Sequence, residues 1–251
     1  MGEIISGRNP VLEALKAGRP INKILLDKNI TRHSVIGEIL NQAKGQNVPI
    51  EYVGRQIIEK QVPVVNQGII AYAAAKQYVN LDDLIAISSK KNELPFYVIL
   101  DGIEDPQNLG AILRTAEATG IHGVIIRERR EVGLTAAVAR ASAGAIEYVP
   151  VARVTNIAQT IEELKKNNIW VIGIDMSAKT DYHRVDYKVA TAIVIGGEGS
   201  GLSTLVRKRC DVVVSIPMKG KISSLNASVA AALVMYEAYR QRELPFSSNG
   251  A

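Results

Sequence analysis

The second half of the chain alternates short, continuously apolar runs with amphipathic segments. The apolar runs lack the period-two alternation of a half-exposed strand, which indicates strands covered on both faces. They are FYVILDGI, HGVIIR, IWVIGID, TAIVIGG and DVVVSIPM, and the predicted helices are NLGAILRTAEATG, VTNIAQTIEELKKNN and the segment that follows residue 226. The pattern predicts an α/β fold, with a mainly parallel sheet and helices on both sides.

The beginning of the chain predicts a smaller, separate α/β unit. NPVLEALKAG predicts a helix with Asn9 as the N-cap and Pro10 at the first helical position. The segments INKILLD, PIEYV and QGIIAYAA predict strands, and HSVIGEILNQAKGQN predicts a helix. A polar segment follows and ends before Pro95, which is typical of a linker. We therefore expect a first domain at residues 1–77, a linker at 78–94 and a second domain at 95–251.

Composition excludes several classes of protein. The chain has 251 residues, of which 47% are hydrophobic and 22% are charged, as in ordinary globular proteins. A single cysteine, Cys210, excludes an internal disulfide, and the three histidines lack the spacing of zinc ligands. No apolar run approaches the ~20 residues that cross a bilayer, and the first ten residues lack a signal-peptide core. We expect a cytoplasmic, metal-free protein with no membrane partner.

The positive charge of the chain is concentrated in its first third. The formal net charge is +5, of which residues 1–80 contribute +4 and residues 81–251 contribute +1. A local excess of this kind is typical of surfaces that bind a phosphate backbone, although many basic surfaces bind nothing in particular. Charge therefore makes nucleic acid a candidate partner of the first domain.

Three loops are candidates for a ligand site, because ligands of parallel sheets bind at the carboxyl ends of the strands. These loops are DGIEDPQN, GGEGSG and IPMKGKISSLN. The glycine-rich loop lies too late in the chain for a dinucleotide-binding fingerprint, and the third loop lacks the glycine of a P-loop. What remains is a flexible backbone that lets a flat ligand approach closely.

Each polar residue of these loops also has an ordinary explanation. Glu198 suits a solvated turn, Arg114 a solvated helix surface, and Asn108 a helix cap. Ser224 and Asn226 stand before a long apolar helix, where they are either N-caps or polar groups at the mouth of a site. The residues alone thus indicate a ligand site in an α/β domain, with RNA as a candidate partner.

Three ordered motifs carry a resemblance that is more specific. DPQNLGAILRTAEATG, IVIGGEGSGLS and IPMKGKISSLNASVAAALVMYE resemble the motifs of the SPOUT-class TrmH/SpoU RNA ribose methyltransferases. ISGRNPVLEALKAGRPINKILL resembles the substrate-binding domain of the bacterial 23S rRNA guanosine 2′-O-methyltransferases. The resemblance implies an L30e-like α/β domain that binds RNA, followed by an α/β SPOUT domain with a trefoil knot, a rare exception to the absence of knots.

The resemblance also implies a reaction, a cofactor and a set of site residues. It implies S-adenosylmethionine as the methyl donor and a homodimer with the site near its interface. The expected substrate is a guanosine of 23S rRNA, which the resemblance of the N-terminal domain favours, and tRNA is the alternative. The same motifs also fit antibiotic self-resistance through another rRNA nucleotide, or a non-catalytic RNA-binding or ribosome-assembly protein. The implied cofactor-binding residues are Gly196, Gly197, Ile216, Met218 and Leu225, and the implied catalytic residues are Asn108, Arg114, Glu198, Ser224 and Asn226.

Transfer to a 2′-hydroxyl is an in-line displacement at a sulfonium methyl group. The protein must orient the sugar oxygen and help to remove its proton. A guanidinium remains protonated in ordinary settings, so we expect Arg114 to grip a phosphate beside the target ribose. That phosphate or Glu198 would accept the proton. We expect Ser224 and Asn226 both to cap the last helix and to serve the site.

Overall fold

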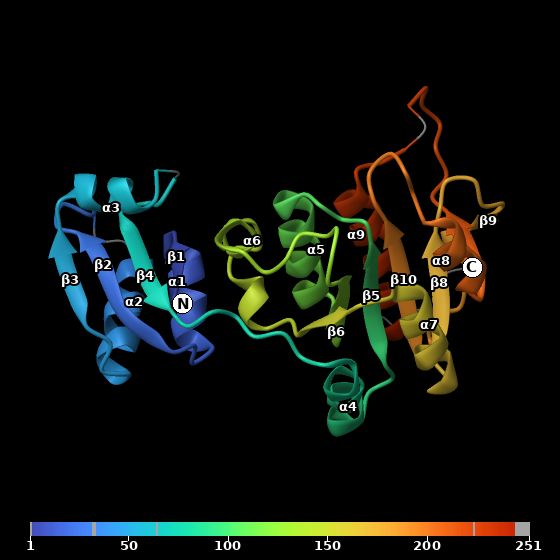
Figure 1. The fold of residues 1–251 in the computed structure, drawn as a ribbon, viewed down its shortest axis with the longest axis horizontal. Helices are drawn as coiled ribbons and strands as arrows, with labels where there is room; N and C mark the ends of the chain where they lie inside the picture. The colour runs from blue at the N-terminus through green and yellow to red at the C-terminus, as the bar shows by residue number, and fades with distance from the viewer. Residues whose placement is uncertain (1, 32–33, 64, 223, 244–251) are drawn as a thin grey trace, which may run out of the picture. The chain divides into compact units, whose positions relative to one another are not determined.

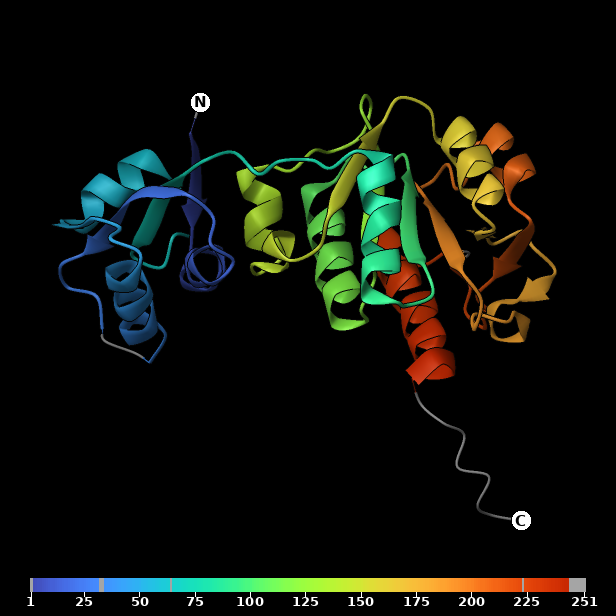
Figure 2. The same ribbon diagram turned by 90° about the horizontal axis from the view of Figure 1, so that it is seen from below.

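The chain folds into two compact units in a computed structural model that describes residues 2–31, 34–63, 65–222 and 224–243 (Figures 1 and 2). The N-terminal unit consists of Met1–Gln77 and Leu134–Tyr148, and the C-terminal unit of Tyr78–Gly133 and Val149–Ala251. Ser223, one of the polar residues before the last helix, lies outside the described residues. None of the described helices is long and apolar enough to cross a membrane.

The N-terminal unit is built on a four-stranded mixed sheet of order β1-β4-β2-β3. Strand β4 is antiparallel to β1 and β2, and β2 is parallel to β3, so β1, β2 and β3 run in one direction. Its elements are β1 (Glu3–Ser6), α1 (Arg8–Lys16), β2 (Ile21–Asp27), α2 (Ser34–Gly45), β3 (Ile50–Val53), α3 (Arg55–Gln61), β4 (Ile69–Ala73), α6 (Ala136–Ala141) and the 3₁₀ helix η1 (Ala145–Glu147).

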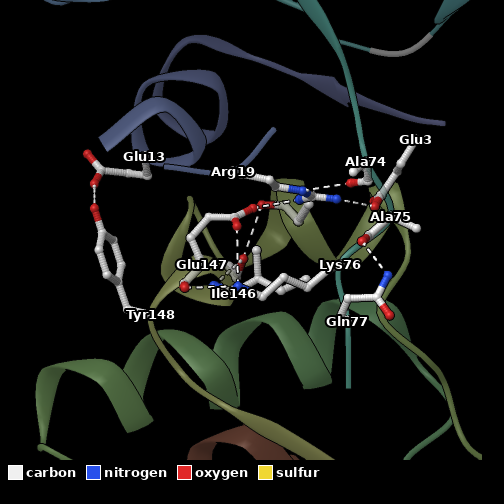
Figure 3. Close-up of polar contacts among 12 residues, drawn as sticks. Glu3, Glu13, Arg19, Ala74, Ala75, Lys76, Gln77, Ile146, Glu147 and Tyr148 are labelled. Carbon is white, nitrogen blue, oxygen red and sulfur yellow. Dashed lines mark hydrogen bonds and ion pairs between the residues drawn. The ribbon is translucent and has the colours of Figure 1, made fainter. Parts of the chain in front are cut away.

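A buried ionic cluster fixes the distant segment 134–148 within this unit (Figure 3). The Arg19 guanidinium donates to Glu3, to the Ala74 carbonyl at 2.9 Å and to Glu147 Oε1 at 2.7 Å. Lys76 Nζ donates to the Glu147 carbonyl at 2.9 Å. The side chains of Arg19 and Glu147 are only 5% and 2% exposed, so each charge depends on its partner for compensation.

The C-terminal unit contains a seven-stranded sheet of order β7-β6-β5-β10-β8-β11-β9, in which every pairing is parallel. The predicted mainly parallel sheet is therefore confirmed. Its elements are α4 (Leu81–Lys91), β5 (Phe96–Asp101), α5 (Pro106–Ala118), β6 (Gly123–Arg127), β7 (Val151–Val154), α7 (Ile157–Lys166), β8 (Trp170–Ile174), β9 (Thr180–Asp181), the 3₁₀ helix η2 (Tyr182–Arg184), β10 (Thr191–Gly196), α8 (Thr204–Arg209), β11 (Val212–Ser215) and α9 (Ala227–Glu243).

Helices cover both faces of this sheet, as the continuous apolar runs predict. Alternate strand residues, such as Tyr97, Ile99 and Val194, share one buried cluster with Leu84 of α4 and Ile161 of α7. Helices α5 and α9 pack side by side away from that cluster (Figures 1 and 2). The chain thus returns from β11, near one edge of the sheet, to α9 beside α5. A return of this kind is what the expected trefoil knot requires, and the knot stays a prediction.

The structure differs from the expected domain limits in two places. The predicted linker 78–94 contains helix α4, which Asn80 caps and which buries Leu84 completely. Helix caps and apolar contact with the sheet are both present in a segment whose composition suggests a linker. Segment 134–148 belongs to the N-terminal unit, because Glu147 pairs there with Arg19, so residues 95–251 are not a self-contained unit.

The first helix also begins earlier than its sequence suggests. Its N-cap is Gly7, with φ of 100° and no side-chain cap, and Arg8 is the first helical residue. Asn9 therefore lies inside the first turn and is not the cap. A glycine adopts this φ without the steric cost that a side chain would bring.

Candidate active site

A cavity of about 590 Å³ lies at the carboxyl ends of β8, β10 and β11. The glycine-rich loop after β10 and the segment between β11 and α9 form most of its wall. All five residues implied as cofactor-binding line it, and three of the five implied catalytic residues line it as well. They are Gly196, Gly197, Ile216, Met218 and Leu225, together with Glu198, Ser224 and Asn226.

The two glycines at the end of β10 allow loops to pack in direct backbone contact. A Cβ atom on Gly196 would lie 2.2 Å from the carbonyl carbon of Gly201, and one on Gly197 would lie 2.3 Å from the carbonyl oxygen of Gly102. Both distances are impossible for a real side chain. The loop after β10 is therefore folded back on itself and pressed against the loop after β5.

Three polar side chains from the three loops meet in one hydrogen-bonded triangle. Asn108 Nδ2 donates to Glu198 Oε1 at 2.9 Å, and Asn226 Nδ2 donates to the same oxygen at 2.7 Å. Asn226 Nδ2 also lies 2.9 Å from Asn108 Oδ1, which accepts from it. The pairs are 90, 28 and 118 residues apart in sequence, so only the fold brings them together.

The helix caps explain why these amides are available to the site. Asp105 caps α5 by accepting from the Gln107 N–H at 2.9 Å, which leaves the buried Asn108 side chain for Glu198. Asn226 Oδ1 caps α9 by accepting from the Ser228 N–H at 2.9 Å, while its Nδ2 reaches Glu198. One amide can do both because its acceptor and its donor are separate atoms.

Ser224 and Arg114 are placed differently from that triangle. Ser224 lines the cavity and makes no hydrogen bond among the described residues, so it does not cap α9 there. Arg114 lies on the exposed surface of α5, six residues beyond Asn108, and is not part of the cavity wall. Six residues correspond to about 9 Å along a helix axis. Within the described chain, the guanidinium and the cavity are separate.

Comparison with known proteins identifies the group to which this chain is related. Residues 95–236 match the SpoU rRNA methylase family, and residues 4–79 match the RNA 2′-O ribose methyltransferase substrate-binding family. The chain belongs to the SpoU rRNA methylase family. The predicted enzyme class, an RNA 2′-O-methyltransferase of the TrmH/SpoU group, is thereby confirmed, and so is the predicted pairing of an N-terminal substrate-binding domain with a methylase domain.

Relatives within the family match over nearly their whole length. A Bacillus subtilis (strain 168) protein named as a TrmH family tRNA/rRNA methyltransferase is 48% identical over 240 residues, which is 96% of each chain. A Staphylococcus aureus (strain MSSA476) protein of similar name is 48% identical over 239 residues, covering 95% of this chain and 96% of that protein. The membership thus applies to both units.

Solved structures agree with the family assignment. The SpoU methyltransferase AviRb from Streptomyces viridochromogenes, in complex with the cofactor AdoMet (S-adenosylmethionine), superposes with a TM-score of 0.79. It is 26% identical, and the match covers 96% of this chain and 90% of that one. An RNA 2′-O ribose methyltransferase matches with a TM-score of 0.77 and 26% identity, over 95% of this chain and 88% of that one. The predicted cofactor is therefore the one held by a homologous structure.

The cavity of this family member fits a flat, partly apolar cofactor. Its volume lies within the range typical of small-molecule sites. Ile174, Ile216 and Leu225 supply apolar wall, and the two glycines expose backbone where a ligand can approach. Among the described residues, no group of three or more His, Cys, Asp or Glu is arranged to hold a metal ion. The wall suits an organic ligand.

Asp175 is a residue of this cavity that the motifs do not reveal. It follows β8 and lines the cavity wall. Burial alone would raise the pKa of its carboxyl, but hydrogen bonds from Ser177 and Arg207 outweigh burial and hold that pKa below its usual range. An aspartate at the carboxyl end of a buried strand was the signal that could have identified it.

Two further carboxylates bind the segments next to the glycine-rich loop. Asp101 is buried and accepts from the Arg127 guanidinium at 2.6 Å and the Ser203 N–H at 2.8 Å. Glu131 accepts from the N–H groups of Gly102, at 2.7 Å, and Arg127, at 2.6 Å. Burial raises the pKa of Glu131 even though these backbone donors oppose the rise. The sequence offers no signal for Glu131, which lies in an irregular segment.

Proposed function

We propose that this RNA 2′-O-methyltransferase methylates the ribose of a guanosine in 23S rRNA. The observation that carries the proposal is the convergence of Asn108, Glu198 and Asn226 at a cavity whose glycine wall admits a flat cofactor. A tRNA nucleotide is the second candidate, because the Bacillus subtilis relative is named for both tRNA and rRNA. An RNA substrate also favours the predicted cytoplasmic location.

The residues that would hold the cofactor are those of the glycine-rich wall and its apolar neighbours. Bound S-adenosylmethionine supplies an electrophilic methyl group whose departure leaves a neutral thioether. Gly196 and Gly197 expose their backbone to the ligand, while Ile216, Met218 and Leu225 provide apolar contact. The role of these residues is to bind and orient.

The polar triangle would orient the sugar and receive its proton. Both amide donors bind Oε1 of Glu198, which fixes that carboxylate and leaves Oε2 without a hydrogen bond from the described residues. We therefore propose that Oε2 of Glu198, or a neighbouring RNA phosphate, accepts the proton of the 2′-hydroxyl. Ser224, on the same wall, is placed to donate a hydrogen bond to the incoming nucleotide.

A homodimer would complete the site. Val229, Leu233 and Tyr236 of α9 are 46%, 39% and 51% exposed, and their spacing puts them on one helix face. Apolar faces of this kind mark interaction surfaces. Because α9 packs against α5, a dimer through this face would also place Arg114 of α5 at the interface. There its guanidinium would grip the phosphate beside the target ribose.

The Arg114→Ala variant tests this division of roles. Transfer of tritiated methyl groups to in vitro transcribed 23S rRNA should fall at least roughly 100-fold, because the reacting ribose loses its positioning contact. Cofactor affinity, measured by calorimetry, should stay within about twofold of the wild-type value, because Arg114 is not part of the cavity wall. The Arg209→Ala variant, which removes an exposed arginine outside the cavity, is the control.

Two outcomes would contradict the proposal. Wild-type turnover in Arg114→Ala would remove Arg114 from the mechanism, and absence of transfer to any RNA by the wild-type protein would favour a non-catalytic role. Mapping 2′-O-methylation in rRNA and tRNA from cells with and without the protein would identify the nucleotide. A loss of 2′-O-methylation confined to tRNA would show that tRNA, and not 23S rRNA, is the substrate.

A further inference from the structure

A second cavity lies within the N-terminal unit, at the edge where the parallel strands β1, β2 and β3 end. Its volume is about 610 Å³. The carboxyl edge of parallel strands is where α/β units commonly bind ligands. The residues of its wall that carry the argument are Arg8, Asn9, Asp27, Asn29, Arg55 and Gln67. None of them belongs to the candidate active site.

The charges around this cavity are arranged unusually for a helix start. Helix α1 begins with Arg8, its N-cap Gly7 provides no side-chain hydrogen bond, and its first turn has no acidic residue. The amino end of a helix carries partial positive charge, so a cation there is unfavourable and an anion is favourable. Gln67 Oε1 accepts from the Arg8 N–H at 2.8 Å, a neutral group where an acid is usual.

The Arg8 side chain supplies an independent indication of a ligand. Its Nε atom is buried and has no hydrogen-bond partner in the described part of the chain. A buried, unpaired donor destabilises the folded state unless something occupies it. Arg8 also lines the cavity, and a change of its side-chain rotamer would bring this donor to an anion bound there.

Arg55 adds a second guanidinium to the wall. Its Nε donates to Glu59 at 2.8 Å, and this contact leaves the terminal nitrogens of the fork for another acceptor. The acid of the wall is the buried Asp27, whose Oδ1 already accepts from the Asn29 N–H at 3.0 Å. Cationic groups therefore outnumber anionic ones in the wall, and the amides of Asn9, Asn29 and Gln67 add neutral polar groups.

We propose that this cavity binds a backbone phosphate of the RNA substrate, with Arg8 and Arg55 as its ligands. The inference rests on the proposed function for the identity of the substrate. A guanidinium fork matches a phosphate in shape and charge. The surrounding first 80 residues carry a net charge of +4, which favours a polyanion over a free phosphate.

The variants Arg8→Gln and Arg55→Gln of the full chain test the inference, with Lys44→Gln as the control. Lys44 is exposed in the same unit and lies outside the cavity wall, so its substitution removes one charge without touching the site. Binding to 23S rRNA transcript should weaken about tenfold in each arginine variant. The slope of log affinity against log salt should fall by about 0.7 to 0.9 for each phosphate that the variant no longer binds. The Lys44→Gln variant should bind within about twofold of wild type.

The readouts separate this inference from the proposed function. Cofactor affinity by calorimetry should be unchanged in all variants, and thermal unfolding should show intact folding. Wild-type affinity and salt slope in both arginine variants would overturn the inference while leaving methyl transfer established. If guanosine monophosphate binds as tightly as the RNA, the ligand is not the RNA backbone, and the cavity is a mononucleotide site. Failure of the wild-type protein to bind RNA would remove both proposals.

Discussion

The two cavities lie at equivalent edges of their sheets but are built in opposite ways. In the C-terminal unit, Asn108, Glu198 and Asn226 hold one another in place through hydrogen bonds that are formed without a ligand. In the N-terminal unit, Arg8 has a buried donor with no partner among the described residues, beside a helix start that repels it. The first arrangement is preorganised, whereas the second leaves a cationic side chain with an unpaired donor.

This difference shows how polar groups divide between stability and binding. A group whose partners are all internal stabilises the fold, and a group without partners is available to a ligand at a cost to the fold. Removing a satisfied group should therefore reduce stability or positioning. Removing an unsatisfied one should weaken binding without lowering stability, and should raise stability where the unpaired group is buried.

The Gly197→Ala variant should have the largest effect. The new Cβ would lie 2.3 Å from the Gly102 carbonyl oxygen, so the loops after β5 and β10 must separate. Methyl transfer should fall by at least roughly 100-fold, since displacement of a site by about 1 Å has effects of this size. Unfolding in urea should show a loss of about 1–3 kcal/mol from overpacking.

Its matched control is Gly37→Ala in helix α2, where an added Cβ meets nothing within 4 Å. That variant should gain about 0.5–1 kcal/mol, as alanine is favoured over glycine within a helix. Full activity in Gly197→Ala would show that the glycine wall is not needed for the cofactor.

The Asn226→Asp variant should have the next largest effect, and it separates the cap from the site. Aspartate still accepts from the Ser228 N–H, so α9 keeps its cap and stability should change by less than about 1 kcal/mol. The Nδ2 donor to Glu198 is removed and a second carboxylate faces Glu198. Transfer should fall about 30-fold, the equivalent of about 2 kcal/mol for a hydrogen bond to a charged group. A large loss of stability with normal turnover per folded molecule would reduce Asn226 to a cap.

The Glu237→Gln variant tests a buried charge in the C-terminal unit that has hydrogen-bond partners within the protein. Hydrogen bonds from Arg240, and then from Gln241, lower the pKa of the Glu237 carboxyl to about 2 despite its burial. A carboxyl whose pKa is lower in the folded state than in the unfolded state stabilises the fold at pH values above about 4.5. That stability is lost as the pH falls from about 4.5 towards 2. The variant should lose about 2 kcal/mol at pH 7.

The pH dependence of unfolding checks this result. The difference between wild type and Glu237→Gln, measured in urea, should shrink as pH falls below about 4.5. The exposed Glu162 pairs with Arg209 on the surface, and Glu162→Gln should cost less than about 1 kcal/mol. A pH-independent difference for Glu237→Gln would show that its contacts act through shape alone.

The smallest loss of stability should come from Arg8→Gln. Because its buried Nε has no partner within the described residues, its removal should not lower the free energy of unfolding and should raise it by up to about 1 kcal/mol. The same variant should still weaken binding to the 23S rRNA transcript, since it removes a cation from the cavity wall. A loss of stability as large as that of Glu237→Gln would mean that Arg8 is structural and that the two cavities do not differ in this way.

The apolar pattern predicts the regular elements well where local and tertiary preferences agree. The runs INKILLD and TAIVIGG form β2 at Ile21–Asp27 and β10 within the predicted limits. The pattern fails for α4, whose polar composition suggests a linker, and for α3 and α8, which are short. In α4 the local signals were present, with the Asn80 cap, acidic residues in the first turn and lysines in the last, and burial of Leu84 against the sheet adds to them.

The motifs pointed to residues that line the cavity or bond to its wall, but they did not show how these residues are arranged. Asn108, Glu198 and Asn226 meet as a set because three strands end at the same sheet edge, which the strand pattern implies. Asp175 and Glu131 were not predicted, because each gains its partners only after folding. The role of Arg114 stays a prediction, because the described chain leaves this residue outside the cavity wall.

By itself the sequence determined the strands, the main helices, the glycine loop and the positive charge of the first third, since all of these follow from residue type and spacing. Only the tertiary structure decided that segment 134–148 joins the N-terminal unit through Arg19 and Glu147. It also decided that Asn226 uses one amide atom to cap α9 and the other to bind Glu198, and that the Arg8 donor is left unpaired among the described residues. The physical reason is that ion pairs and hydrogen bonds depend on distances of about 3 Å between residues far apart in sequence. Such distances are fixed only when the sheets and helices have packed.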